Sequence, residues 1–282
     1  MKKKNTVSRR DLLKAGGTVA AAATVSGLHA TDAGAETAGQ RWAFVVDLRR
    51  CVGCRTCTIS CKSEFNVPLG RWRAVIKPVD WGTYPDNKRQ FVPRLCNHCA
   101  GSTEKGEPPC VEKCPENSRG ERMKMGDVRY RTGATYKRPD GMILIDMQYC
   151  IGCYKCIDAC PYGVRYIDPG VKLKRDDKEN EFGIGKCTFC EHRVANGIEP
   201  SCVQACPHGT RTFGDMNDPA SKVSKLIKEF NLDKNRDKTT LLPEEGTVPH
   251  VFYIDPDGVL NRYKFDYKDK DKRLAEFRDN II

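Results

Sequence analysis

The sequence predicts an α+β fold in which short strands, short helices and loops surround four groups of cysteines. The chain has 282 residues, and its sixteen cysteines all fall into four tight runs. Hydrophobic residues make up 39% and charged residues 30% of the chain, so a large apolar core is not expected to hold it together. The first and third runs share one spacing, and the second and fourth nearly share another, which indicates a repeated supersecondary unit.

Residues 1–35 have the features of an export signal, in the expected order. Three lysines follow Met1, the segment Ser8–Lys14 resembles a twin-arginine motif, and Ala33–Ala35 offers a small-residue cleavage site. The apolar stretch between them is 14 residues long, too short for a bilayer core of roughly 30 Å. We therefore expect export by the twin-arginine machinery, with a disordered basic tail as the alternative. No later segment approaches 18 apolar residues, so no direct membrane span is expected.

The cysteine runs repeat along the chain. The first run has the spacing C-x2-C-x2-C-x3-C and consists of Cys51, Cys54, Cys57 and Cys61. The third has the same spacing and consists of Cys150, Cys153, Cys156 and Cys160. The second run, C-x2-C-x10-C-x3-C, consists of Cys96, Cys99, Cys110 and Cys114. The fourth run, C-x2-C-x11-C-x3-C, consists of Cys187, Cys190, Cys202 and Cys206.

Short regular elements are expected beside the first and third runs. Apolar residues favour strands at 42–47 and 142–146, each directly before a run. A turn of helix is predicted at 58–60 and at 157–159, where it would carry the last cysteine of its run.

The rest of the chain is expected to form connections and a C-terminal segment. Residues 118–139 and 171–181, rich in charged residues, are predicted to be irregular surface insertions. Apolar residues at helical spacing predict a helix over 220–230, and a strand is expected at 248–254. The Lys- and Asp-rich end from Arg262 is expected to be a solvated or docking tail.

The spacing of the cysteines favours [4Fe–4S] clusters. Three cysteines in a C-x2-C-x2-C loop can wrap one cube, while the fourth, three residues later, has turned away and ligates a neighbouring cluster in two-cluster bacterial ferredoxins. A proline follows the last cysteine of three runs, as in that pattern, and Lys62 takes its place in the first. Sixteen cysteines therefore predict four [4Fe–4S] clusters.

Three other uses of the cysteines are less compatible with the sequence. The second and fourth runs alone would suit zinc, but three cysteines within seven residues crowd one tetrahedral ion, and this occurs twice. Disulfides suit an exported chain with an even cysteine count, but Cys-x2-Cys-x2-Cys offers poor local partners. A thioredoxin-like redox site needs one C-x-x-C motif rather than four.

The net charge does not indicate a nucleic-acid partner. The formal charge is +11, but residues 1–35 hold six Lys or Arg and two Asp, which leaves 42 basic against 35 acidic residues and a charge of +7. Four clusters with thiolate ligands would add roughly −8 and bring the loaded protein near neutrality. No nucleic-acid binding is expected.

Four segments resemble the iron–sulfur subunits of the complex iron–sulfur molybdoenzymes. They are Asp47–Cys54, Pro93–Cys99, Lys186–Cys190 and Gly246–Tyr253, and the resemblance covers about 41–255. In the residues flanking the cysteines, the similarity is greatest to the tetrathionate reductase subunit. The polysulfide, thiosulfate and arsenate reductase subunits are similar too, as are those that serve nitrite reduction. The resemblance implies an α+β fold of two interleaved bacterial dicluster-ferredoxin-like modules with loop-rich insertions.

The family's ligand pairing can be carried over because all sixteen positions match. It implies four sets, which we call sites A to D. Site A takes Cys51, Cys54, Cys57 and Cys206. Site B takes Cys61, Cys187, Cys190 and Cys202. Site C takes Cys96, Cys99, Cys110 and Cys160. Site D takes Cys114, Cys150, Cys153 and Cys156. Some relatives have an aromatic residue in place of Cys153 and hold a three-iron cluster there, whereas this chain has the cysteine.

This pairing divides the chain after the signal peptide into three parts. Module 1 would comprise 41–90 with 182–215, and module 2 would comprise 91–170. Residues 216–282 would supply a C-terminal helix, a strand and a docking tail.

The expected function is electron transfer without catalysis, since no nucleophile, general base or substrate pocket is visible. The resemblance implies a relay between a polytopic membrane quinol-oxidising subunit and a molybdopterin catalytic subunit. The complex would be an anaerobic respiratory reductase, of the sulfur-oxyanion type such as tetrathionate. It would lie in the periplasm or on the outer face of the cytoplasmic membrane. The alternatives are a quinone-interacting transmembrane complex with cytochrome partners and no molybdoenzyme, and a zinc-bound binding module.

Charged residues beside the runs are candidates for tuning the cluster potentials. They are Arg49, Arg50, Arg55, Lys62, Lys155, Arg165 and Lys186. Ordinary solvated charge is the alternative for each of them. Since sixteen cysteines complete the ligand count, His98 and His192 are expected to be hydrogen-bonding neighbours rather than ligands.

Overall fold

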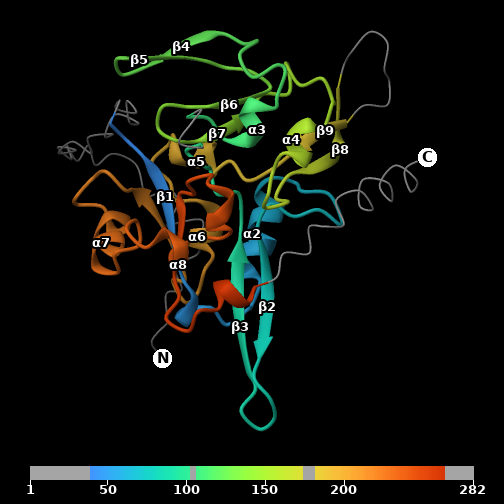
Figure 1. The fold of residues 1–282 in the computed structure, drawn as a ribbon. Helices are drawn as coiled ribbons and strands as arrows, with labels where there is room; N and C mark the ends of the chain where they lie inside the picture. The colour runs from blue at the N-terminus through green and yellow to red at the C-terminus, as the bar shows by residue number, and fades with distance from the viewer. Residues whose placement is uncertain (1–38, 102–105, 174–181, 264–282) are drawn as a thin grey trace, which may run out of the picture. The chain divides into compact units, whose positions relative to one another are not determined.

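The computed structural model describes residues 39–101, 106–173 and 182–263 (Figure 1). The predicted signal at 1–35, residues 174–181 of the second insertion and the tail from residue 264 lie outside the described residues. Among the residues that are described, no helix has the length and apolar character needed to cross a membrane.

A three-stranded sheet joins distant parts of the sequence. Strand β1 (Trp42–Asp47) lies in its centre, antiparallel to β10 (Arg211–Asp215) and parallel to β11 (Val251–Ile254). The predicted strands at 42–47 and 248–254 are thereby confirmed, the second being shorter than expected. Since Val46 pairs with Arg211, the end of β1 and the start of β10 lie together. The first and fourth cysteine runs therefore approach each other at this edge.

The two faces of β1 are buried against different partners. Alternate residues of a strand point to opposite faces, so Ala43 and Val45 share one face and Phe44 and Val46 the other. The first pair packs with helix α7 (Lys222–Glu229), whose Val223 and Ile227 are buried. The second pair belongs to the larger core that contains cysteines. Helix α7 confirms the prediction for 220–230 and begins after Ser221, whose hydroxyl accepts a hydrogen bond from the Val223 amide at 3.2 Å.

Within the described ranges, the remaining strands form four two-stranded antiparallel ribbons. They are β2 (Val75–Trp81) with β3 (Lys88–Arg94), β4 (Arg122–Met125) with β5 (Val128–Arg131), β6 (Thr135–Lys137) with β7 (Ile143–Ile145), and β8 (Tyr166–Lys172) with β9 (Phe182–Gly185). Strand β7 confirms the strand expected at 142–146.

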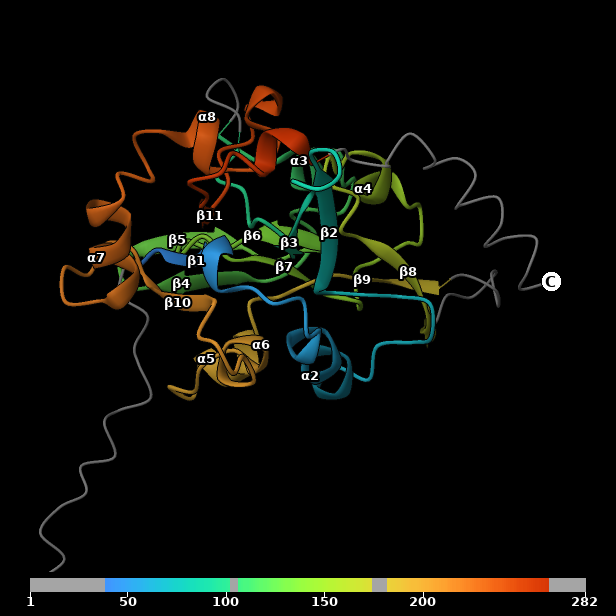
Figure 2. The same ribbon diagram turned by 90° about the horizontal axis from the view of Figure 1, so that it is seen from below.

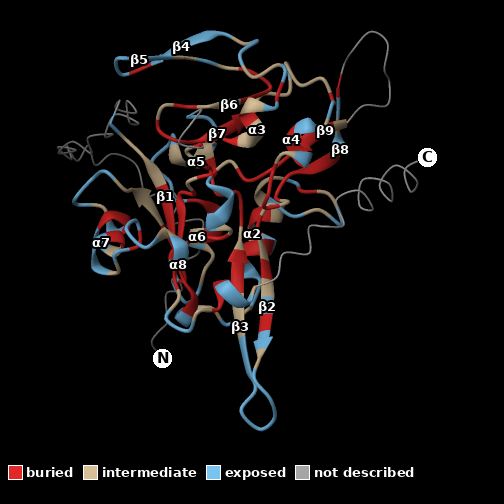
Figure 3. Ribbon diagram, in the orientation of Figure 1, coloured by how far each residue is buried: buried red, intermediate tan, exposed pale blue. Residues whose placement is uncertain are grey.

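The prediction of irregular structure at 118–139 was wrong. Strands β4, β5 and β6 occupy half of it, and the β4–β5 hairpin is mainly exposed (Figure 3). Basic residues alternate with Met123, Met125, Val128 and Tyr130 on either side of a Gly-Asp turn. That period of two, which is typical of a strand, was concealed by the high charge of the segment. The start of the 171–181 insertion likewise continues β8 to Lys172.

The helices are short, and four of them carry cysteines. These are α2 (Thr56–Glu64), α3 (Pro109–Glu112), α4 (Lys155–Asp158) and α6 (Ser201–Gln204), one in each run. The turn of helix predicted after Cys57 lies in α2, which carries Cys61 as expected. The turn predicted after Cys156 lies only partly in α4, which ends at Asp158 and does not reach Cys160. Other short helices are α5 (Glu191–Val194) and α8 (Arg236–Thr239), with 3-10 turns at Leu48–Arg50, Pro243–Glu245 and Leu260–Arg262. The chain is thus a mixed α and β protein of short helices and small sheets.

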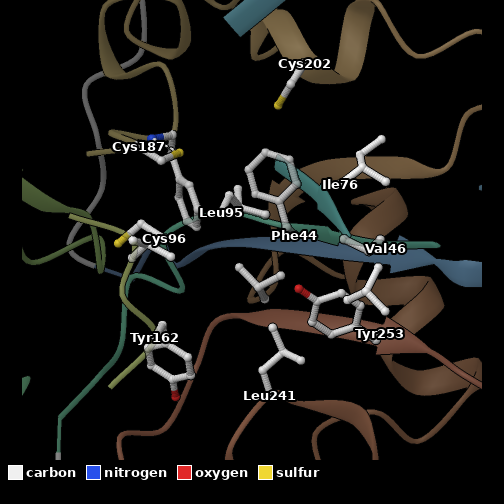
Figure 4. Packing of buried hydrophobic residues seen from close by; sticks show 14 of the residues in the cluster. Phe44, Val46, Ile76, Leu95, Cys96, Tyr162, Cys187, Cys202, Leu241 and Tyr253 are labelled. Atoms are coloured by element: carbon white, nitrogen blue, oxygen red, sulfur yellow. Dashed lines mark hydrogen bonds between the residues drawn. The ribbon is translucent and has the colours of Figure 1, made fainter. Parts of the chain in front are cut away.

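Cysteines form part of the main core. Cys57, Cys96, Cys99, Cys160, Cys187 and Cys202, which come from all four runs, belong to one buried cluster with apolar residues. Figure 4 shows three of them beside Phe44, Leu95 and Tyr253. The core is therefore shared between hydrocarbon and sulfur, as the modest apolar content of the chain predicts.

Candidate metal centres

The packing of the cysteine-bearing helices pairs the runs. Helix α2 of the first run packs against α6 of the fourth, and α3 of the second packs against α4 of the third (Figure 2). All sixteen cysteines are free thiols. In the described ranges, no group of three or more His, Cys, Asp or Glu side chains is arranged to hold a single metal ion.

Two of the four sets line pockets. The cysteines of site A line one, together with Ile76, Thr210 and Arg211. The cysteines of site D line another, together with Thr135, Tyr154 and Ile184. Each pocket has a volume of about 290 Å³, part of it open to solvent. Cys54 and Cys153, which occupy the same place in the first and third runs, are exposed.

The thiols of sites B and C are more deeply buried. Burial, followed by the thiolates of Cys202 and Cys190, raises the pKa of Cys61 to about 12. Burial also raises the pKa of Cys99, and the thiolates of Cys96, Cys110 and Cys160 add to the rise. In sites B and C the thiols thus lie close enough to influence one another, and their thiolate forms are stable there only if a positive charge or a metal compensates them.

Sites B and C lie beside each other. The pKa of Cys187 is raised first by burial and then by the thiolates of Cys61, Cys202 and Cys96. The last of these belongs to site C, and Figure 4 shows Cys187 and Cys96 as neighbours.

The loops of the first and third runs have the same backbone conformation. Gly53 and Gly152 have φ of 73° and 68°, and Arg55 and Tyr154, just before helices α2 and α4, have φ of 61° and 57°. A side chain at Gly53 would place its Cβ 2.5 Å from Cε1 of Phe91. Glycine is therefore required there by both conformation and space, and the sequence repeat corresponds to a repeat in shape.

Several hydrogen-bond donors point at the sulfur atoms. The Thr210 amide donates to Sγ of Cys206 at 3.3 Å, and the Phe189 amide donates to Sγ of Cys187 at 3.4 Å. Burial raises the pKa of Cys206, but hydrogen bonds from Thr210, His208 and Arg211 outweigh it, so the pKa is lowered overall. Such donors favour the thiolate, which is the form that binds iron. The residues present therefore fit [4Fe–4S] clusters, whose ligands are four thiolates each.

Five of the seven candidate tuning residues are exposed or have other hydrogen-bond partners. Arg50, Arg55 and Lys155 are exposed, and Arg49 pairs with Asp47 at 2.8 Å on the surface. The ammonium of Lys62 instead donates to the carbonyls of Val67, Pro68 and Arg71. Since exposed charges are screened by water and salt, the four exposed residues are expected to shift the potential of a buried centre only weakly.

Arg165 and Lys186 are buried, with 5% and 1% exposure. The ammonium of Lys186 donates to the carbonyls of Ile143 and Cys187, which ties β7 to the fourth run.

The sequence reasoning missed a third buried cation, Arg211, which is 2% exposed and lines the site A pocket. Its Nη1 lies 3.9 Å from Sγ of Cys202 in site B. A signal was present: Cys160–Arg165 and Cys206–Arg211 both have the pattern C-P-x-G-x-R. Only the burial of both arginines shows that this repeat matters.

The two histidines make hydrogen bonds, as expected. His98 accepts from the Ile143 amide at Nδ1, 2.9 Å away, so Nε2 carries the proton and donates to the Cys187 carbonyl at 3.0 Å. Its ring stacks on Phe189 at 3.6 Å. His192 lies 2.8 Å from a carboxylate oxygen of Glu64. His98 thus joins the second and fourth runs to strand β7.

Comparison with known proteins agrees with this site chemistry. The family model described as a 4Fe-4S dicluster domain matches residues 87–216. A tetrathionate reductase subunit from Salmonella typhimurium is 35% identical over 223 residues, covering 78% of this chain and 74% of the relative. The iron–sulfur subunit of arsenate respiratory reductase from a Shewanella species is 38% identical over 262 residues, covering 79% of this chain and all of the relative.

A third relative comes from a menaquinol oxidoreductase. This protein, iron–sulfur subunit 1 of an Hdr-like menaquinol oxidoreductase from Archaeoglobus fulgidus, is 34% identical over 251 residues, covering 76% of this chain and 83% of the relative. Relatives of this identity and coverage share the family, and the cysteine sites and the dicluster domain agree with them. The chain belongs to the family of iron–sulfur subunits of the complex iron–sulfur molybdoenzymes.

Proposed function

We propose that the chain is the non-catalytic electron-transfer subunit of an anaerobic respiratory reductase, carrying four [4Fe–4S] clusters. The observation that carries the proposal is the grouping of sixteen free cysteines into four buried or pocket-lining sets within this family. Electrons would pass between a membrane quinol-oxidising subunit and a molybdopterin catalytic subunit. Tetrathionate or a similar sulfur oxyanion is the proposed substrate class of the complex.

The cysteines would hold the clusters in the crossed pairing of sites A to D. The packing of α2 on α6 and of α3 on α4 supports it, as does the electrostatic influence of the last cysteine of each run on cysteines of its partner run. This corresponds to two interleaved modules, 41–90 with 182–215 and 91–170. Residues 216–282 add α7, which covers the sheet, and β11, which completes it.

The sites would form a row in the order A, B, C, D. When bound, [4Fe–4S] clusters accept and release single electrons at potentials that the surrounding protein tunes. Arg211 lies between the cysteines of A and B, and Cys187 of B neighbours Cys96 of C. Arg165 interacts electrostatically with Cys110 of C and with Cys156 of D, and so links these two sites. The exposure of Cys54 and Cys153 supports a row whose two ends lie near the surface, where partner subunits would exchange electrons.

Export is part of the same proposal. Residues 1–35 would direct the folded, loaded protein through the twin-arginine machinery to the periplasm or the outer face of the cytoplasmic membrane. Export in the folded state suits a chain whose clusters are inserted with folding.

The crossed pairing is tested by matched Cys→Ser variants of the complete subunit, prepared anaerobically and examined by electron paramagnetic resonance. Cys206→Ser is expected to damage the same cluster signal as Cys51→Ser, because both residues belong to site A. Cys202→Ser, four residues away, is the matched control and should damage the signal affected by Cys61→Ser. If Cys206→Ser and Cys202→Ser perturb one common signal instead, the fourth run serves a single cluster and the pairing is wrong.

The second candidate function is the iron–sulfur subunit of a quinone-interacting complex with cytochrome partners and no molybdoenzyme. The menaquinol oxidoreductase relative favours it. Purification of the intact complex separates the two. Molybdenum or tungsten together with iron is expected for the reductase, whereas haem without either metal would support the second candidate.

A further inference from the structure

Two buried arginines each leave part of a positive charge without a partner. Nη2 of Arg165 and Nη2 of Arg211 are buried and have no hydrogen-bond acceptor within the described part of the chain. Both guanidinium groups lie in the interior, at 5% and 2% residue exposure. A guanidinium is always charged, and an uncompensated buried charge is strongly destabilising. An anionic group beside each arginine would remove this cost.

The surroundings of Arg211 contain cysteines of both sites of module 1. Its side chain lines the pocket formed by Cys51, Cys54, Cys57 and Cys206, and its Nη1 lies 3.9 Å from Sγ of Cys202 in site B. Burial lowers the pKa of Arg211, but its anionic neighbours, led by the thiolates of Cys57 and Cys202, together outweigh burial and raise the pKa overall. The guanidinium thus lies between sites A and B.

Arg165 occupies the corresponding position in module 2. Its Nη1 donates at 3.2 Å to the hydroxyl of Thr135, which lines the site D pocket. Burial lowers its pKa, and the thiolates of Cys110 and Cys156 lead the interactions that raise it overall. Cys110 belongs to site C and Cys156 to site D, so this guanidinium lies between sites C and D.

The two arginines are equivalent in sequence and in backbone conformation. Each stands five residues after the last cysteine of its run in the pattern C-P-x-G-x-R, and the glycines, Gly163 and Gly209, have φ of 56° and 57°. Arg119 also stands five residues after the last cysteine of a run. Its side chain, however, is 72% exposed and forms an ion pair with Glu116. A spacing of five residues after a cysteine is therefore not enough to bury an arginine. In both places where the C-P-x-G-x-R turn occurs, however, its arginine is buried.

We propose that Arg211 and Arg165 are equivalent tuning residues, each placing one permanent positive charge between the two clusters of a module and donating from Nη2 toward their anionic surface. The proposal rests on the four-cluster function. Each oxidised site with its four thiolates carries roughly −2, and one-electron reduction makes it roughly −3. A guanidinium beside two sites stabilises the added charge at either one and so raises both potentials.

The test uses Arg211→Gln and Arg165→Gln in the complete subunit, with midpoint potentials measured by dithionite titration followed by electron paramagnetic resonance. The Cys→Ser variants described above identify the signals. Arg211→Gln is expected to move the potentials of sites A and B to lower values and leave C and D in place. Arg165→Gln should do the reverse. Arg119→Gln is the matched surface control and should leave all four potentials unchanged.

Two results would overturn the proposal while leaving the four-cluster function intact. One is full iron content in Arg211→Gln or Arg165→Gln with unmoved potentials. The other is an equal shift of all four potentials, which would show a general change of the fold rather than a local charge. A wild-type protein with far fewer than about sixteen irons would instead contradict the proposed function itself.

The lysine variants decide the case in which glutamine prevents cluster assembly. Arg211→Lys and Arg165→Lys keep the charge but lose the planar donor fork. Retention of iron and of near-native potentials in the lysine variants, with loss of one module's clusters in the glutamine variants, supports the charge role. Loss of the same clusters from both variants shows that the guanidinium is needed for its shape, and this overturns the proposal.

Discussion

At the residue scale, His250 shows how the interior suppresses charge. Its Nδ1 lies 2.8 Å from the His98 carbonyl and therefore donates to it, while the backbone amide of His250 donates to the Asn97 carbonyl at 2.9 Å. Burial, followed by the positive charges of Arg41, Arg236 and Lys137, lowers the pKa of His250 from 6.5 to about 4. The folded protein therefore keeps this ring neutral at pH values where the unfolded chain protonates it.

This shift predicts a loss of stability on acidification. Between pH 6.5 and about 4 the unfolded state binds a proton that the folded state does not, so stability falls as the pH falls. From about pH 7.5 to about 5.5 the loss due to His250 should be about 1.4 kcal/mol. The variant His250→Asn retains a side-chain amide donor but does not titrate.

The measurement is native-state hydrogen exchange of the β1 and β11 amides at both pH values, under anaerobic conditions. On acidification, the free energy of exchange should fall by about 1.4 kcal/mol more in the wild type than in His250→Asn. Identical pH dependence in the two proteins would show that the ring does not titrate differently in the folded and unfolded states.

Residue identity explains why the cluster ligands could be predicted and Arg211 could not. The ligand chemistry of cysteine and its local spacing are both written in the sequence, so Cys51 or Cys150 can be assigned without a structure. An arginine is usually solvated. The importance of Arg211 depends on its burial beside Cys57, which is far away in the sequence, and beside Cys202, which lies on helix α6.

At the element scale, strand β1 separates two cores. Ala43 and Val45 pack on α7, whereas Phe44 and Val46 face the core that contains cysteines. The cluster sites should therefore be insulated from changes in α7, although that helix contributes to the stability of the sheet.

Ile227→Ala tests this separation. Ile227 is 4% exposed, and its truncation should lower the free energy of unfolding by about 2–5 kcal/mol through lost burial and a residual cavity. Lys225→Ala, on the exposed side of the same helix, should change it by less than about 0.5 kcal/mol. Both variants should keep all four paramagnetic signals and full iron content, with stability followed by hydrogen exchange of β1. Loss of a cluster in Ile227→Ala would show that the two cores are coupled.

Elements also differ in how far the sequence reveals them. Strand β1 and helix α7 carry strong apolar patterns and were predicted within a few residues. The β4–β5 hairpin was not, because its alternation involves largely exposed Met, Val and Tyr among basic residues, with no well-buried face to strengthen the signal.

At the scale of the whole molecule, metal binding and folding should be a single process. Six of the sixteen cysteines lie in the main core, and burial raises the pKa of Cys61 to about 12 and of Cys156 to about 11. Buried thiolates are stable only where a positive charge or a metal compensates them. Iron is therefore expected to stabilise the native packing directly.

Removal of iron by an anaerobic chelator should abolish the tertiary structure. The expected result is loss of near-ultraviolet circular dichroism and of amide protection in β1 and β11, in parallel with loss of iron. Untreated protein under the same conditions is the control. An iron-free protein that keeps its protected amides would show that the apolar part of the core is sufficient for folding.

The sequence by itself determined the grouping of the cysteines in runs and predicted the ligands and the cluster type, because metal-loop chemistry depends on spacings of two or three residues. It also determined the strongly apolar elements, since burial is encoded in their periodicity. Only the tertiary structure decided that Arg165 and Arg211 are buried beside the thiols and that Cys187 neighbours Cys96. Those relations depend on contacts between residues far apart in the chain, and the energy of a buried charge is set by what packs around it rather than by its neighbours in sequence.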